Sequence, residues 1–194
     1  MIIDTTWRII PQNLPCVIRH CSKCNRKMSF YCSQKFRVNS NQLRADIWLI
    51  YKCSKCDTTW KLTLIRGVKP ADLPIDLFEK FTNNDTDLAK KYAFDRQLLK
   101  QNDCEIDYSG VDYHVEGVDS IIFPLRVSIE SLYFFDLKLS TLLANILDIS
   151  VSSVRKLVDG GMITTTPPCN IMKYRIRADF NLSIDTHKHP CIFP

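Results

Sequence analysis

Two copies of the tetrapeptide Cys-Ser-Lys-Cys are the part of this chain best suited to chemistry. The first runs from Cys21 to Cys24 and the second from Cys53 to Cys56. Two residues between thiols allow both sulfurs to reach one metal ion from a single tight turn, and two such turns supply four thiolates. This is the ligand set of a closed tetrahedral zinc site, which leaves no position for a catalytic water. We therefore expect Cys21, Cys24, Cys53 and Cys56 to hold structural Zn²⁺, in a protein that is not an enzyme.

The residues around the two pairs support this interpretation. Asn25 and Asp57 directly follow the pairs, and both residue types tolerate the left-handed conformation that a tight metal turn often needs. The 28 residues between Cys24 and Cys53 suit a zinc ribbon in which the intervening chain forms strands. The other five of the nine cysteines have no partner at short spacing, so in a reducing cytosol we interpret them as small apolar residues.

Charge is unevenly distributed along the chain, although the net charge is only +5. Residues 1–70 hold 13 Lys or Arg against 3 acidic residues, residues 71–118 hold 5 against 11, and residues 119–194 hold 8 against 7. A basic segment that carries a metal site favours a polyanionic partner, most often nucleic acid. The candidate phosphate ligands in this segment are Arg19, Lys23, Arg26, Lys27, Lys52 and Lys55. The alternative is that these cations face solvent or pair with the acidic middle of the chain.

The pattern of apolar residues places the second cysteine pair between strands. Residues 44–52 are typical of a buried strand leading into the pair, and residues 58–65 of an alternating strand leaving it. Pro70 and Pro74 end this pattern, and residues 71–104 have helical spacing, with a cap at Asn83, Asn84 or Asp85 for a helix that continues to about Gln101. Trp48 and Trp60 are expected in the core, although tryptophans can also stack on bases.

The last third of the chain has a second clear pattern. Leu139, Leu142, Leu143, Ile146 and Leu147 have the spacing of an amphipathic helix. Ser150 is an N-cap candidate for a second helix, which Gly160-Gly161 would end, and alternating apolar residues then predict strands. The sequence thus predicts an α+β fold: a β zinc-ribbon-like domain at 1–70, a helical connecting segment at 71–118, and a domain at 119–194 that combines a helix-turn-helix with strands.

Residues 138–163 resemble the αL RNA-binding motif, a small module of the ribosomal protein S-four type. The residues that carry the resemblance are Ile149-Ser150, Ser152, Val154-Arg155-Lys156-Leu157, Gly161 and Ile163, followed by Lys173-Tyr174-Arg175-Ile176-Arg177. Ser140 and Val151 stand where the motif usually has an Asp and a basic residue. The resemblance implies RNA phosphate contacts through Lys138, Arg155, Lys156, Arg175 and Arg177. The same helices could instead form a winged-helix reader of duplex DNA.

Nearly the whole chain also resembles a bacterial family of unknown function, the one numbered 1062 among such domains (DUF1062). Residues 36–41, 46–60 and 91–95 carry this resemblance. It implies a cytoplasmic bacterial protein with an N-terminal region like a zinc ribbon, and it implies no activity.

Taken together, these patterns predict a cytoplasmic, zinc-binding accessory protein associated with RNA. No stretch approaches 18 apolar residues, and the N-terminus lacks the features of a signal peptide, so we expect no membrane partner. A winged-helix DNA-binding regulator and a protein–protein adaptor that docks an acidic partner remain alternatives. His187, His189 and Cys191 are a weaker candidate for a second metal site.

Overall fold

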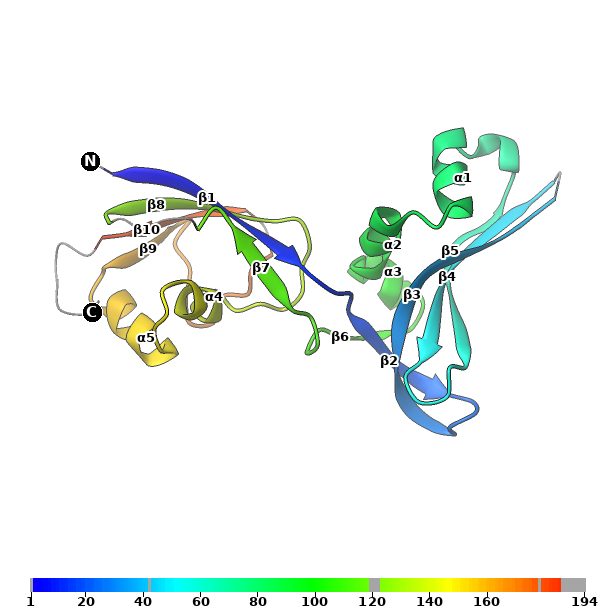
Figure 1. The fold of residues 1–194 in the computed structure, drawn as a ribbon, viewed down its shortest axis with the longest axis horizontal. Coiled ribbons are helices and arrows are strands. Elements are labelled where there is room, and N and C mark those ends of the chain that lie inside the picture. Colours follow the sequence, from blue (N-terminus) through cyan, green and yellow to red (C-terminus); the bar gives the residue numbers. More distant parts are fainter. Residues whose placement is uncertain (1, 42, 119–122, 178, 186–194) are drawn as a thin grey trace. The chain divides into compact units, whose positions relative to one another are not determined.

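The chain forms two compact units, each built around a five-stranded sheet (Figure 1). The computed structural model describes residues 2–41, 43–118, 123–177 and 179–185. Unit 1 combines Met1–Gln12 with Asp112–Pro194, and unit 2 is Asn13–Val111. The sequence led us to expect three segments, 1–70, 71–118 and 119–194, and the boundaries of the two units differ from these. Unit 1 joins the two ends of the chain, so its sheet depends on pairing between residues far apart in the sequence.

Unit 2 is an antiparallel sheet with helices inserted before its last strand. The strands lie in the order β5-β4-β3-β2-β6. Their bounds are β2 (Cys16–Cys21), β3 (Arg26–Ser40), β4 (Ala45–Cys53), β5 (Thr59–Val68) and β6 (Glu105–Asp107). Between β5 and β6 lie η1 (Pro70–Asp72), α1 (Ile75–Thr82), α2 (Thr86–Ala93) and α3 (Arg96–Gln101). The expected strands around the second cysteine pair are therefore confirmed as β4 and β5.

The helices of unit 2 cover one face of its sheet. Side chains of β4 alternate between buried and half-buried, as expected for a strand with one face on a core. Ile47 packs with Phe81 of α1 and Leu88 of α2, and Leu49 belongs to a cluster that includes Leu99 of α3. The side chains on the opposite face of β3, β4 and β5 are half-buried or exposed.

The helix expected to continue to Gln101 is divided in two. Asp85 caps α2 by accepting the backbone N–H of Leu88, and Asp95 caps α3 by accepting that of Leu98. An Asp that caps a new helix interrupts the preceding one, because its backbone is extended rather than helical. The prediction of one continuous helix was therefore wrong at Phe94-Asp95.

Unit 1 is a mixed sheet in the order β7-β1-β8-β10-β9. Its strands are β1 (Ile3–Pro11), β7 (Tyr113–Glu116), β8 (Leu125–Ser131), β9 (Ile163–Thr166) and β10 (Phe180–Ile184). β1 runs parallel to β8, and the other pairs are antiparallel. Helices α4 (Leu139–Ile146) and α5 (Val151–Asp159) lie on one side of this sheet (Figure 1), and Ser150 caps α5 by accepting the N–H of Ser153, as predicted.

The predicted fold class was nevertheless wrong. The structure is mostly β, with 42% of the described residues in strands and 24% in helices. It is not an α+β arrangement of a small zinc ribbon, a helical middle and a C-terminal helix-turn-helix domain. The helices at 139–146 and 151–159 are present, but they lie in a unit whose sheet includes the N-terminal strand β1. Within the described residues, no helix is long and apolar enough to cross a membrane.

The close approach of β1 and β7 gives a test of this long-range pairing. Gly117 has a φ of +83°, and a Cβ at this position would lie 2.1 Å from the backbone oxygen of Thr6. We expect Gly117→Ala to destabilise the β1–β7 pair by about 1–3 kcal/mol, which would be measured as faster hydrogen–deuterium exchange of peptides from both strands. Gly110→Ala is the control, because its Cβ would meet no atom within 4 Å. Equal exchange in the two variants would contradict this account of the sheet.

Candidate metal centre

The four cysteines lie in two turns that join neighbouring strands of unit 2. Cys21 ends β2 and Cys53 ends β4, and in each case the second cysteine lies in the turn before the next strand. Asn25 and Asp57 follow with φ values of 52° and 56°, so the predicted left-handed conformation is confirmed at both turns. The backbone N–H of Ser54 donates to the carbonyl oxygen of Ser29 at 2.9 Å, which ties the second turn to β3.

This arrangement brings all four sulfurs together. The Sγ atoms of Cys21 and Cys56 are 3.5 Å apart, those of Cys24 and Cys53 are 3.9 Å apart, and all four lie within 4.8 Å of one another. Cys21 and Cys53 are buried, and Cys24 and Cys56 are half-buried. These distances exceed the roughly 2.05 Å of a disulfide bond, so the cysteines are free thiols. The four cysteines could hold a metal ion.

The sulfur spacing fits a single tetrahedral ion. Four sulfurs at about 2.3 Å from a central Zn²⁺ form a tetrahedron with edges of about 3.8 Å. Two of the sulfur–sulfur distances, 3.5 Å for Cys21 and Cys56 and 3.9 Å for Cys24 and Cys53, lie on either side of that value, and none of the others exceeds 4.8 Å. A cluster of several iron atoms would need its sulfurs further apart, because the metals must lie between them. The donor set itself suits Zn²⁺ or a single iron ion.

Hydrogen bonds within the turns perturb the thiols in different directions. The hydroxyl and backbone N–H of Thr58 lower the pKa of the Cys56 thiol to about 6, and the Thr58 oxygen lies 3.1 Å from its Sγ. The backbone N–H of Cys24 lowers the pKa of Cys21. The pKa of Cys24 is raised to about 12, chiefly by its hydrogen bond with the sulfur of Cys56. Since a metal binds thiolates, binding requires the loss of the Cys24 proton.

The remaining described cysteines lie outside this cluster. Cys16, Cys32, Cys104 and Cys169 are half-buried. Burial raises the pKa of Cys32 to about 11, and burial also raises the pKa of Cys104. With a raised pKa, the thiols of Cys32 and Cys104 stay protonated at neutral pH. The candidate second metal site at His187, His189 and Cys191 lies outside the described residues.

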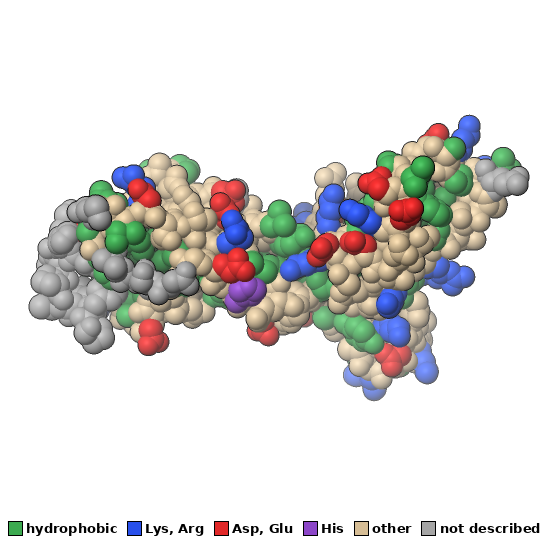
Figure 2. Space-filling view, turned by 45° about the horizontal axis from the view of Figure 1, so that its top comes forward, with side chains coloured by type: hydrophobic (Ala, Val, Ile, Leu, Met, Phe, Trp, Pro, Cys, Tyr) green, Lys and Arg blue, Asp and Glu red, His purple; other side chains and the backbone are tan. Residues whose placement is uncertain are grey.

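The basic residues expected to contact phosphates have different surroundings in unit 2. Arg19 is half-buried, and its guanidinium lies 4.0 Å from the centroid of the Trp60 ring. Lys27 forms an ion pair with Glu105 at 3.6 Å. The other candidates, of which Lys52 is half-buried and the rest are exposed, are Lys23, Arg26, Lys52 and Lys55. In Figure 2, Lys and Arg side chains gather around the lower lobe of unit 2, which carries the cysteine turns.

The candidates in unit 1 are also divided. Lys138, Arg155 and Lys156 are exposed. Arg175 forms an ion pair with Asp136, and the guanidinium of Arg177 lies 5.8 Å from the centroid of the Phe134 ring. The last two side chains are therefore held by neighbouring groups of unit 1, whereas the first three point to solvent.

Sequence reasoning named Lys52 and Trp48 but missed the group of residues on unit 2 to which they belong, which only the strand pairing reveals. We call it the open face, and it consists of three cross-strand rows on β3, β4 and β5: Arg37, Trp48 and Thr63; Lys35, Ile50 and Lys61; Tyr31, Lys52 and Thr59. Four of the nine residues are cations and none is acidic. The alternation of side chains within each strand could be read from the sequence, but the register between the strands could not.

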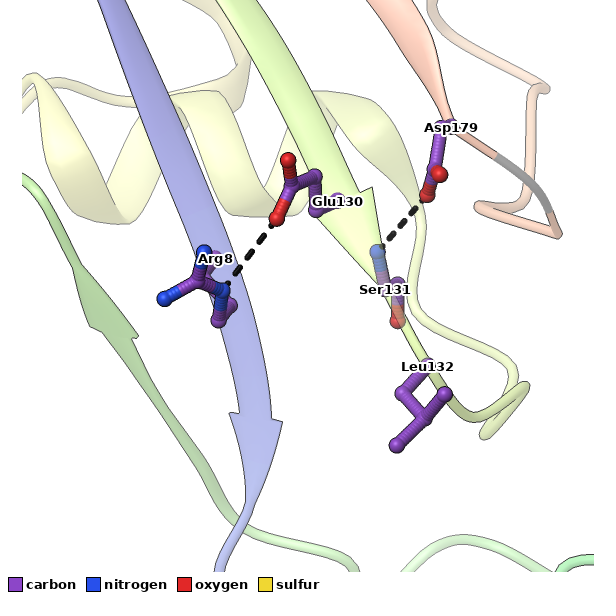
Figure 3. A pocket seen from close by; sticks show the side chains of 5 residues that line it. All are labelled: Arg8, Glu130, Ser131, Leu132 and Asp179. Carbon is purple, nitrogen blue, oxygen red and sulfur yellow. Dashed lines mark hydrogen bonds and ion pairs between the residues drawn. The ribbon is translucent and has the colours of Figure 1, made fainter.

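Unit 1 has a surface pocket whose charged groups are already paired (Figure 3). It is lined by Arg8, Glu130, Ser131, Leu132 and Asp179. The Nε of Arg8 donates to Glu130 at 3.2 Å, and the carboxylate of Asp179 accepts the backbone N–H of Ser131 at 3.3 Å. Since its three charged side chains all have protein partners, this pocket is a weaker candidate site than the cysteine cluster.

The fold and the site define a mostly β protein of two units, one of which carries a four-thiol centre able to hold a metal ion. The chain belongs to the family described as Protein of unknown function (DUF1062), whose model matches residues 38–168. The matched range includes the cysteine pair at 53–56 and begins after the pair at 21–24. No curated protein and no solved structure was found to match the chain.

The hydrogen bond between Tyr31 and Asp57 gives a test of the second turn. The Tyr31 hydroxyl donates to Asp57 at 3.0 Å, and this bond raises the pKa of Tyr31 above the ordinary value of about 10. The bond therefore stabilises the fold fully below pH of about 10, and this contribution is lost as the pH rises through the raised pKa. Asp57→Asn should lower the pKa of Tyr31 and retain the turn, because Asn25 adopts the same conformation in the first turn. Titration of the tyrosine ring carbons by NMR measures this shift, and an unchanged pKa in the variant would contradict the contact.

Proposed function

We propose that this chain is a structural zinc protein that associates with RNA. The observation that carries the zinc assignment is the set of four thiol sulfurs within 4.8 Å of one another, with two of the pairs at 3.5 and 3.9 Å. A closed four-thiolate site has no open coordination position, so the metal stabilises the fold and does not activate a water molecule. The residues proposed to hold Zn²⁺ are Cys21, Cys24, Cys53 and Cys56.

The position of the thiols supports a structural role. Two of the four are buried, and they end β2 and β4, whose neighbours β3 and β5 begin directly after the turns. A metal ion at this point would link two hairpin turns of the same sheet. We infer that it aligns those hairpins and fixes the strands that follow them.

The association with RNA rests on charge. Residues 13–69, which form the sheet around the cysteine centre, contain 12 Lys or Arg against 2 acidic residues. A four-thiolate zinc site lowers the net charge of this region by about 2 and leaves it basic. A surface with this balance attracts the phosphate backbone of nucleic acids. We propose that Lys23, Arg26 and Lys55, which are exposed at or beside the two turns, contribute phosphate contacts.

Replacing one thiol tests the zinc centre. We expect Cys53→Ser to lose stoichiometric zinc and to expose the backbone of residues 16–66, because a buried ligand is removed and the turns are no longer linked. Elemental analysis and hydrogen–deuterium exchange measure the two effects. Cys104→Ser is the matched control, since this half-buried thiol lies outside the cluster. Retention of one zinc per chain and of native exchange in Cys53→Ser would show that the ligand assignment is wrong.

The salt dependence of RNA binding tests the proposed association with RNA. A labelled single-stranded RNA should bind the zinc-loaded full chain, and the three phosphate contacts proposed above would make its affinity fall about 20-fold between 50 and 200 mM salt. Fluorescence anisotropy measures this change, with duplex DNA of equal length as the comparison. If the DNA duplex bound more tightly, the partner would be DNA. If neither bound, the basic surface would serve another partner or only face solvent.

A further inference from the structure

We propose that the open face of unit 2 binds RNA together with the exposed cations of the neighbouring cysteine turns, and that it takes single-stranded RNA with a base stacked on Trp48. This inference rests on the proposed association with RNA and specifies where and in which form the RNA binds. The face consists of the three cross-strand rows defined above, on β3, β4 and β5.

The open face lies opposite the helices of unit 2. Helices α1, α2 and α3 pack on the face that carries Ile47, Leu49 and Tyr51 of β4. Side chains alternate across a strand, so Trp48, Ile50 and Lys52 project from the other face. Trp60 shows the contrast, because it pairs with Tyr51 and packs against the helix-covered core. The two tryptophans expected together in the core thus lie on opposite faces.

The charges on this face are of one sign and are regularly spaced. Lys35 and Arg37 lie two residues apart on β3, which places their Cα atoms about 6.7 Å apart along the strand. Lys61 lies across the sheet from Lys35, on the far side of β4, and Lys52 lies in the next row. Asp46 and Asp57 border this face. Asp46 lies opposite Asn39, beyond the row of Arg37 and Trp48, and accepts the N–H of Gly67 at 2.8 Å, whereas Asp57 accepts the hydroxyl hydrogen of Tyr31 at 3.0 Å. A row of phosphates would therefore meet four cations.

Aromatic rings on the same face supply a platform for bases. Trp48 is half-buried between Arg37 and Thr63, and the Nζ of Lys61 lies 5.3 Å from the centroid of its ring. Lys61 is exposed, so a base can replace its ammonium on the ring face while the ammonium moves to a phosphate. Tyr31 is 41% exposed and pairs with Lys52 two rows away. Basic side chains interleaved with aromatic rings are typical of surfaces that bind single strands.

The open face is built from strand residues alone, which favours a single strand over a duplex. In a duplex the bases are stacked on one another and cannot reach a ring that lies within a sheet. In a single strand they can turn toward the protein and stack, while the phosphates remain at the exposed ends of Lys and Arg. No helix or wedge of the kind that enters a DNA groove projects among these nine residues.

Two sets of variants test the assignment on the zinc-loaded full chain, with a labelled 15-nucleotide oligouridine as the probe. Lys35→Gln combined with Arg37→Gln should reduce the slope of log affinity against log salt by roughly 1.4, because two phosphate contacts are lost. Trp48→Leu should weaken binding about 5- to 150-fold with little change in that slope. Lys80→Gln combined with Lys91→Gln is the matched control, because it removes the same charge from exposed positions on α1 and α2.

Each outcome bears on the proposal. A smaller salt slope in the variant with Lys35→Gln and Arg37→Gln, together with normal binding by the control variant with Lys80→Gln and Lys91→Gln, would support it. If wild-type protein binds the RNA and both pairs behave alike, the open face is not the binding surface, although the association with RNA stands. If the wild type does not bind the RNA, both proposals fail.

A comparison with single-stranded DNA of matched length tests the choice of RNA. Equal or tighter binding of this DNA would overturn the assignment to RNA. Zinc content of each variant shows that it is folded, and the Lys35/Arg37 pair tests the face even if Trp48→Leu does not fold.

Discussion

Four cysteine sulfurs held within 4.8 Å of one another are the constraint on which the rest of unit 2 depends. As thiolates they would repel one another strongly at this spacing, and as thiols they would leave polar hydrogens crowded in a half-buried site. A divalent cation would remove the repulsion and would link the two hairpin turns. The pKa values of Cys56 and Cys24 shift in opposite directions for this reason. Hydrogen bonds from Thr58 lower the pKa of Cys56, whereas the hydrogen bond with the sulfur of Cys56 raises the pKa of Cys24.

Linking the turns has a consequence for the whole sheet. Cys21 and Cys53 end β2 and β4, and β3 lies between these strands in the sheet. Fixing both ends therefore holds β3 and β4 in register from the turns outward. Beyond the turns, a bulge in β3 between Cys32 and Lys35 brings Lys35 opposite Ile50, and the Ser33 hydroxyl donates to the Ile50 carbonyl oxygen at 2.8 Å. The placement of Lys35 and Arg37 beside Trp48 thus follows from the register that the metal centre would stabilise.

The sequence predicted local features well and long-range features poorly, for physical reasons. The left-handed turns at Asn25 and Asp57 and the cap at Ser150 are set by residues close together in the chain, and the structure confirms them. The repeated spacing also indicated the four cysteines, which the structure brings within 4.8 Å of one another, where they could hold a metal ion. The fold class was wrong because β1 pairs with β8, more than one hundred residues away, and no periodicity in either strand indicates that partner. The open face was missed for the same reason. Alternation shows that Lys35, Trp48 and Lys61 could each lie on a sheet face, but only the pairing shows that they lie on the same one.

The central claim is that a single zinc ion joins the four cysteines. X-ray absorption at the zinc edge of the purified protein tests it most directly, because this measurement gives both the identity of the ligands and their distance. The account predicts one zinc per chain with four sulfur neighbours at about 2.3 Å and no nitrogen or oxygen in the first shell. A first shell that contains nitrogen or oxygen, or a protein purified from zinc-containing medium with no zinc bound, would contradict it.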